Sequence, residues 1–185
     1  ETQGRDSIIM TEALGENSAK PNFKLIPLFK PINGQILANT RNNPQQYKIE
    51  SEKILNCWNT IIKGVEIVHE FTNGDMSVAK VLNDLLSGDL LLWMGFLDDK
   101  YCGFITVRKD TNVDAKNFLS MVHLFIKPGT NKETFLNGLG ELKKFAKEQG
   151  CQKMRFWALR KGWEKRLIPL GFEQSYIEYT LDLEG

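Results

Sequence analysis

The chain has few of the residues that build metal centres and disulfide frameworks. It holds two histidines, His69 and His123, and neither has ligand spacing with a cysteine or an acidic cluster, so we expect no metal site. The three cysteines, Cys57, Cys102 and Cys151, are odd in number, far apart and without C-x-x-C spacing. We therefore expect free, buried thiols in a protein of a reducing compartment.

Long apolar runs and a strong net charge are also missing. No run approaches the roughly 20 residues that a membrane-spanning helix needs, and no signal peptide is recognisable. The formal net charge is only +1, so the overall electrostatic field of the protein does not favour the binding of nucleic acid, and such binding is not expected. With 185 residues, 42% of them hydrophobic, the chain can bury the core of one domain. Residues 1–45 are expected to form a polar N-terminal arm, and residues 46–185 the domain.

Helical periodicity opens the expected domain. Ile54 and Ile61 lie on one apolar face, which predicts a helix over 50–63. Gly64 is typical of a helix end, and the alternation over 65–71 predicts a short strand.

Turn signals and periodicity divide the rest of the chain into further elements. The unit over 118–159 reads strand, helix, strand, which predicts two parallel neighbouring strands. The expected elements are an edge strand at 22–29, a helix ending at Gly88, a β-hairpin of 90–96 and 101–107, a strand at 118–126, a helix begun by a Thr130/Glu133 capping box, a strand at 152–159, a short helix at 161–170 and a strand at 172–183.

This order of elements, over residues 50–183, resembles the GNAT (N-acetyltransferase-like) superfamily. Leu124-Phe125-Ile126-Lys127-Pro128 resembles the family's fourth strand and its exit, and Leu170-Gly171-Phe172 resembles the motif before its last strands. The resemblance implies an α/β (α+β) fold: a mixed, mostly antiparallel sheet with a parallel central strand pair and helices on both faces. It also implies acetyl-coenzyme A as cofactor.

A narrower pattern includes Arg160-Lys161-Gly162-Trp163 ahead of Gly171-Phe172. It resembles the GNAT-type proteins that tailed phages encode among their virion and assembly genes.

The sequence of the expected cofactor loop differs from the motif of the GNAT superfamily. In that superfamily the motif Gln/Arg-x-x-Gly-x-Gly/Ala precedes a helix, and the free N–H groups and positive dipole end of this helix bind pyrophosphate. This chain has Asn131-Lys132-Glu133-Thr134-Phe135-Leu136, without either glycine and with an acidic residue near the phosphates. We expect acetyl-coenzyme A to bind weakly or not at all. The candidate cofactor-binding residues are Phe125, Ile126, Asn131, Lys132 and Thr134.

Two residues are candidates for acid–base chemistry. His123, on the expected central strand, could take a proton from an ammonium group near neutral pH. Tyr176 could replace the tyrosine acid that the family often has, whose position here falls near Leu167. Each has a plainer explanation, as a core histidine satisfied by backbone and as a packing residue of a strand.

A group of basic and aromatic residues supplies the candidate contacts with a partner: Arg160, Trp163 and Arg166. It predicts either an ordinary charged surface or a surface that binds the phosphates of coenzyme A, a nucleic-acid backbone or an acidic partner.

Two functions follow from these patterns. The first is a non-catalytic virion or assembly component of phage type, in the virion or host cytoplasm, which binds other virion or assembly proteins. The alternative is an active acyl-coenzyme-A-dependent N-acetyltransferase. A nucleic-acid-binding module rests only on the basic residues, and the small net charge argues against it.

Overall fold

The computed structural model describes residues 21–29, 44–71, 76–157 and 162–175. These residues form a five-stranded sheet in the order β1-β2-β3-β4-β5. The elements are β1 (Phe23–Pro27), α1 (Pro44–Glu70), α2 (Val78–Ser87), β2 (Leu91–Leu97), β3 (Lys100–Thr111), β4 (Asn117–Ile126), α3 (Lys132–Glu148), β5 (Lys153–Phe156), α4 (Glu164–Leu167) and a 3-10 turn over Ile168–Leu170.

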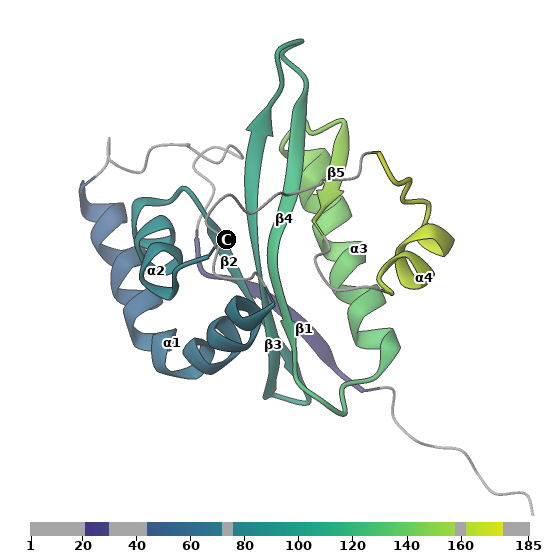
Figure 1. Ribbon diagram of the computed structural model, residues 1–185. Coiled ribbons are helices and arrows are strands. Elements are labelled where there is room, and N and C mark those ends of the chain that lie inside the picture. The colour runs from purple at the N-terminus through teal and green to yellow at the C-terminus, as the bar shows by residue number, and fades with distance from the viewer. Residues whose placement is uncertain (1–20, 30–43, 72–75, 158–161, 176–185) are drawn as a thin grey trace, which may run out of the picture.

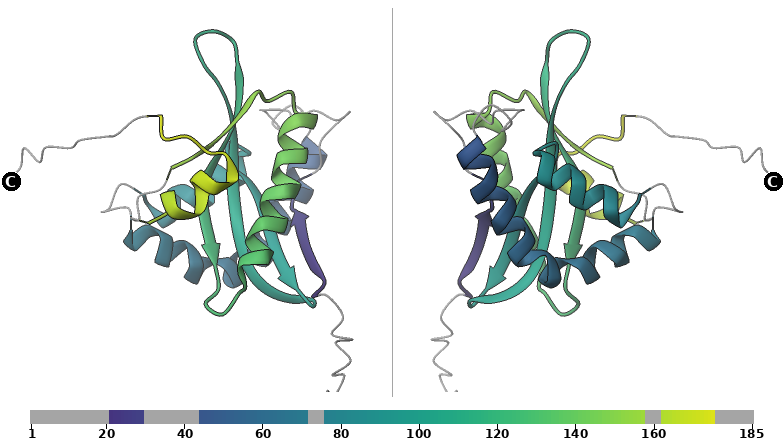
Figure 2. Two further views of the ribbon diagram at one scale, coloured as in Figure 1. Left: turned by 90° about the vertical axis from the view of Figure 1, so that its right-hand side faces the viewer. Right: turned by 90° about the vertical axis from the view of Figure 1, so that its left-hand side faces the viewer.

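The sheet is mixed and mostly antiparallel. Strands β1 to β4 pair antiparallel in succession, and β4 pairs with β5 in parallel. A parallel pair needs a crossover connection, which α3 supplies. Helices α1 and α2 cover one face of the sheet, and α3 and α4 lie over the other (Figures 1 and 2). The predicted fold class, hairpin and parallel strand pair are therefore confirmed, with β5 at the edge of the described sheet.

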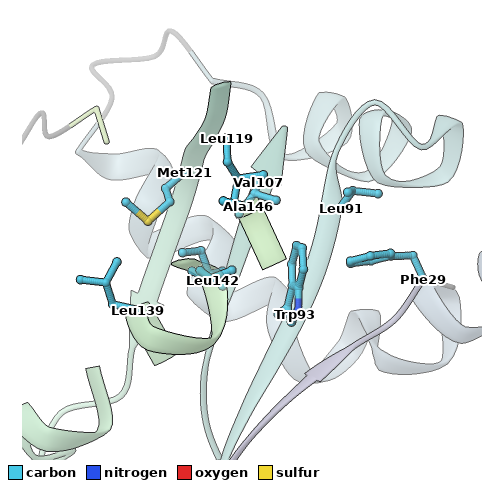
Figure 3. Close-up of a cluster of buried hydrophobic side chains, with 10 residues drawn as sticks. Phe29, Leu91, Trp93, Val107, Leu119, Met121, Leu139, Leu142 and Ala146 are labelled. Atoms are coloured by element: carbon cyan, nitrogen blue, oxygen red, sulfur yellow. The ribbon is translucent and has the colours of Figure 1, made fainter. Parts of the chain in front are cut away.

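Helices on both faces give the sheet two apolar cores. The core under α3 includes Leu142 and the Trp93 ring, whose centroid lies 4.4 Å from that of Phe29 and 4.7 Å from that of Phe145 (Figure 3). The core under α1 and α2 includes Ile61. Because both faces are covered, the first part of β2 is buried at successive residues, which explains its apolar run.

Helix α1 does not end at Gly64, so the predicted strand over 65–71 is wrong. The helix continues to Glu70 because its apolar face continues: Ile61 and Val65 are both buried. Gly64 instead allows the rings of Phe104 and Phe125 to pack closely against the backbone of α1. A Cβ atom built on it would lie 2.6 Å from Phe125 Cδ1 and 2.9 Å from Phe104 Cε1.

We expect Gly64→Ala to destabilise the protein by about 2 kcal/mol, since overpacking against two rigid rings outweighs the better helix propensity of alanine. Gly140→Ala in α3 is the matched control: Gly140 is exposed, and nothing lies within 4 Å of a Cβ built there. That variant should gain about 1 kcal/mol from propensity. Urea unfolding midpoints measure both changes, and equal shifts would contradict the packing role of Gly64.

Strand β3 is longer than the sequence predicts. It runs to Thr111, so Arg108 and Asp110 belong to the sheet and pair with β4. The predicted strand over 172–183 does not begin at its predicted start, because residues 172–175 have no regular structure. The remainder of that prediction lies outside the described residues.

Most of the predicted arm, residues 1–45, also lies outside the described residues. Within it, the edge strand is confirmed as β1, which pairs with β2. Lys24 of this strand forms a salt bridge to Asp99 in the β2–β3 turn at 2.8 Å. In the described part of the chain, no helix is long and apolar enough to cross a membrane.

Candidate functional site

The start of α3 is capped by its own side chains. Asn131 is the N-cap residue, and its Oδ1 accepts hydrogen bonds from Thr134 N at 2.9 Å and from Thr134 Oγ1 at 2.8 Å. Thr134 is buried, whereas Asn131, Lys132 and Glu133 are exposed. The predicted cap at Thr130 is wrong by one residue. The backbone N–H of Thr130 donates instead to the carbonyl of Lys127, in the loop before the helix.

The exit of β4 brings candidate cofactor residues to the same end of the sheet. Ile126 and Thr134 line one apolar cavity, to which Phe125 also contributes. The Phe125 ring packs on the opposite, α1 face, with its centroid 6.0 Å from that of Phe104. The five candidates therefore cluster in space, but the Phe125 side chain is directed into the core away from the start of α3.

His123 lies at an irregularity of β4. It pairs with Thr106 of β3, whereas Val107 pairs with Met121, so Val122 is the extra residue of a β-bulge. Thr106 Oγ1 accepts the backbone N–H of His123 at 3.1 Å and lies 2.7 Å from His123 Nδ1. Since the fully buried Thr106 hydroxyl has one hydrogen, donation to Nδ1 satisfies both groups. We therefore assign the imidazole proton to Nε2.

The surroundings of His123 keep the ring uncharged. Burial lowers the pKa of His123 to about 4; the negative charge of Asp84 opposes this decrease, and the positive charge of Arg108 adds to it. At pH 7 the imidazole is neutral. With Nδ1 engaged by Thr106, the ring can donate a hydrogen bond from Nε2, and it is a weak base.

A polar network beside His123 was missed at the sequence level. Arg108 Nε donates to Asp110 Oδ1 at 2.7 Å, and Ser120 Oγ donates to Asp110 Oδ2 at 2.6 Å. Ser120 is buried. The signal was present in the sequence: Thr106, Arg108 and Asp110 alternate with Ile105 and Val107, a strand period that continues past the predicted strand end.

Trp163 packs among residues from three elements. Its ring centroid lies 4.8 Å from that of Phe156 in β5 and 5.9 Å from that of Phe135 in α3. The Arg166 guanidinium of α4 lies 5.6 Å from the same ring. Trp163 therefore joins α3, β5 and α4, and Arg166 is exposed beside it.

Other candidates add little to this site. Tyr176 and Arg160 lie outside the described residues. Leu167, where the family's tyrosine would fall, is buried. The three cysteines are free thiols, and Cys102 is buried. Among the residues that the structure describes, no cluster of histidine, cysteine and acidic side chains could hold a metal ion.

Comparison with solved structures identifies the fold. No protein-family model and no curated protein sequence matches the chain. An aminoglycoside acetyltransferase from an uncultured soil metagenomic sample superimposes with a TM-score of 0.57 and 14% identity, over 88% of this chain and 97% of that one. A possible acetyltransferase from Clostridium difficile 630 gives 0.56 and 12%, over 88% and 99%.

A third similar structure is a ribosomal-protein-alanine N-acetyltransferase from Brucella melitensis biovar Abortus 2308. Its TM-score is 0.55 at 10% identity, over 88% of this chain and 99% of that one. At such identities the likeness concerns the fold, and it spans nearly the whole of each acetyltransferase. The chain therefore has the GNAT fold that its order of elements predicts.

Proposed function

We propose that this protein uses the GNAT fold as a docking scaffold and not as a coenzyme-A-dependent transferase. The observation that carries the proposal is the cap of α3. A pyrophosphate at this helix start would need free N–H groups, and Asn131 already occupies that of Thr134. The exposed Glu133 carboxylate adds repulsion toward an anion at the same turn.

The aromatic contacts of Trp163 support the same function. In the family, the thioester is expected in the splay between the two parallel strands. Here Trp163 packs against both Phe135 of α3 and Phe156 of β5. A pantetheine chain entering beside β5 would have to displace these contacts.

The state of His123 is a further argument against transfer chemistry. With Thr106 donating to Nδ1, the lone pair that a general base would use is engaged. The polar side chains around His123 therefore serve the packing of β3 on β4.

The kind of partner follows from the resemblance to the GNAT-type proteins of tailed phages. That resemblance supports a virion or assembly component that binds other proteins of the particle. Arg166 beside Trp163 supplies an exposed cation on the same surface. Detection of the chain by mass spectrometry in purified particles, at a fixed copy number, would test this assignment.

We expect acetyl-coenzyme A to produce no saturable heat at low-micromolar protein concentrations in a calorimetric titration. Loss of two or three contacts of about 1 kcal/mol each weakens affinity by a factor of tens to hundreds. The double variant Asn131→Gly with Glu133→Gln should regain part of this affinity, because it frees the Thr134 amide and removes the carboxylate. Low-micromolar binding by the unaltered chain, abolished by Lys132→Glu, would contradict the scaffold and favour the enzyme.

An N-acetyltransferase is the second candidate, favoured by the β-bulge at Val122. Bulges re-aim side chains and leave backbone groups unpaired next to active sites, and this bulge lies directly before His123. Release of coenzyme A thiol from acetyl-coenzyme A, measured with a panel of primary amines, tests it. Amine-dependent release that His123→Ala abolishes in a folded variant would establish this candidate.

A further inference from the structure

Toward the β3–β4 turn, the sheet carries a row of polar side chains on the face opposite α3. Arg108 of β3 pairs with Ser120 of β4, and Ser120 pairs with Arg155 of β5. The residues that precede these three in their strands all pack in the core under α3: Val107, Leu119 and Met154. Because successive side chains of a strand alternate between faces, the row itself lies on the other face. Figure 1 shows this β3–β4 hairpin extending beyond α1 and α2.

Two contacts fix the positions of the guanidinium groups in this row. The guanidinium of Arg155 lies over the Phe118 ring, 3.7 Å from its centroid. The Nε of Arg108 donates a hydrogen bond to Asp110 Oδ1 at 2.7 Å. Asp110 and Phe118 are paired neighbours in β3 and β4, and neighbouring strands lie about 4.8 Å apart. The two guanidinium groups therefore lie over adjacent strands, within reach of one small anion.

Most hydrogen-bond donors of these two arginines are unused. In the described part of the chain, the Nη1 and Nη2 groups of Arg108 have no acceptor, and Arg155 has neither a hydrogen bond nor an ion pair. The Arg108 side chain is 42% exposed, and Arg155 is exposed as well. The Asp110 carboxylate is itself satisfied, because its second oxygen accepts the Ser120 hydroxyl at 2.6 Å. The two arginines thus present free N–H groups to solvent.

We propose that Arg108 and Arg155 together bind a phosphate group. The planar fork of a guanidinium matches the oxygens of a carboxylate or a phosphate, but a single fork already fills both oxygens of a carboxylate. Two forks on neighbouring strands fit the three terminal oxygens of a phosphate, which also carries about −1.5 to −2 charges at pH 7. This site lies on the opposite face of the sheet from α3, and it does not depend on the proposed scaffold function.

Methyl phosphate is the probe for a titration of the full, isotope-labelled chain, followed by NMR at low ionic strength. We expect saturable shifts of the Nε–H signals of Arg108 and Arg155, with half-saturation below about 10 mM. Inorganic phosphate should bind with an affinity within about threefold of that of methyl phosphate, because the exposed site leaves one oxygen in solvent. Acetate should bind at least about tenfold more weakly, since it can engage only one fork.

Substitutions assign the binding to this site. Arg155→Gln should weaken the binding of methyl phosphate by about tenfold or more, the loss expected for hydrogen bonds to a charged group. Lys144→Gln is the matched control: it removes the same charge from an exposed position of α3 and should change the affinity by less than about twofold. Asp110→Asn should tighten binding several-fold, because it removes a competing negative charge. If Arg155→Gln fails to fold, Arg108→Gln should show the same loss.

Three results would contradict this site. The first is the absence of saturable shifts up to about 10 mM methyl phosphate. The second is equal weakening by folded Arg155→Gln and Lys144→Gln, which would indicate attraction by net charge alone. The third is binding of acetate as tight as that of methyl phosphate, which would overturn the assignment of a phosphate ligand.

Discussion

Replacing Trp163 with alanine should lower the free energy of unfolding by about 3 kcal/mol, the lower end of the range for a tryptophan truncated in a packed site. The ring is half-buried and contacts Phe135, Phe156 and Arg166. Its loss removes contacts from α3, β5 and α4 together. Urea unfolding followed by circular dichroism measures the change, with the slope of the transition checked against that of the unaltered chain.

Trp157 provides the control for this variant. It has the same side chain, is 49% exposed and directly follows β5, which ends at Phe156. Trp157→Ala should change the unfolding free energy by no more than about 0.5 kcal/mol, as exposed substitutions usually do. If the two variants lost the same stability, the packing role of Trp163 would be refuted.

Acid should destabilise the protein through His123 between about pH 6.5 and pH 4. The ordinary pKa of 6.5 applies to the unfolded chain, and burial lowers the folded value to about 4. In this window the unfolded state binds more protons than the folded state, so stability rises with pH and falls on acidification. Full stability is present above pH 6.5, and about 3 kcal/mol is lost by pH 4, at 1.36 kcal/mol per pKa unit.

Comparison with His123→Gln isolates this effect from the titration of carboxylates. Both proteins should lose stability in acid, but their difference should change between pH 6.5 and 4, because glutamine does not titrate. Proton NMR of the His123 ring gives the folded pKa directly. A ring that titrates near 6.5, or parallel stability profiles of the two proteins, would contradict the buried neutral imidazole.

Local sequence patterns predicted the elements whose ends are set by neighbouring residues. The β2–β3 hairpin forms at Asp98 and Asp99, which adopt φ values of 49° and 60° in a tight turn. Gly88 ends α2 in the left-handed conformation, with φ 80°. The parallel β4–β5 pair followed from the crossover helix between the strands. These features depend on short-range geometry, so the sequence was sufficient for them.

The candidate site was predictable in position and not in chemistry. The sequence and its resemblance to the GNAT superfamily predicted that Ile126, Asn131 and Thr134 lie at one end of the sheet, and the structure has them there. The pairing of His123 with Thr106, 17 residues away, was not visible, because it depends on a strand register that the bulge at Val122 shifts. The predicted cap at Thr130 failed because a turn beginning at Lys127 uses that residue's N–H.

The sequence by itself therefore determined the order of elements, the GNAT-type topology and the absence of the family's glycines before α3. Only the tertiary structure decided the role of each ambiguous residue. Gly64 has the sequence signature of a helix end, yet it lies inside α1 because Phe104 and Phe125 approach its backbone. Trp163 could have been a surface residue and instead packs against β5 and α3. The physical reason is the same in both cases: contacts between distant segments exceed the few tenths to about 1 kcal/mol that local propensity contributes.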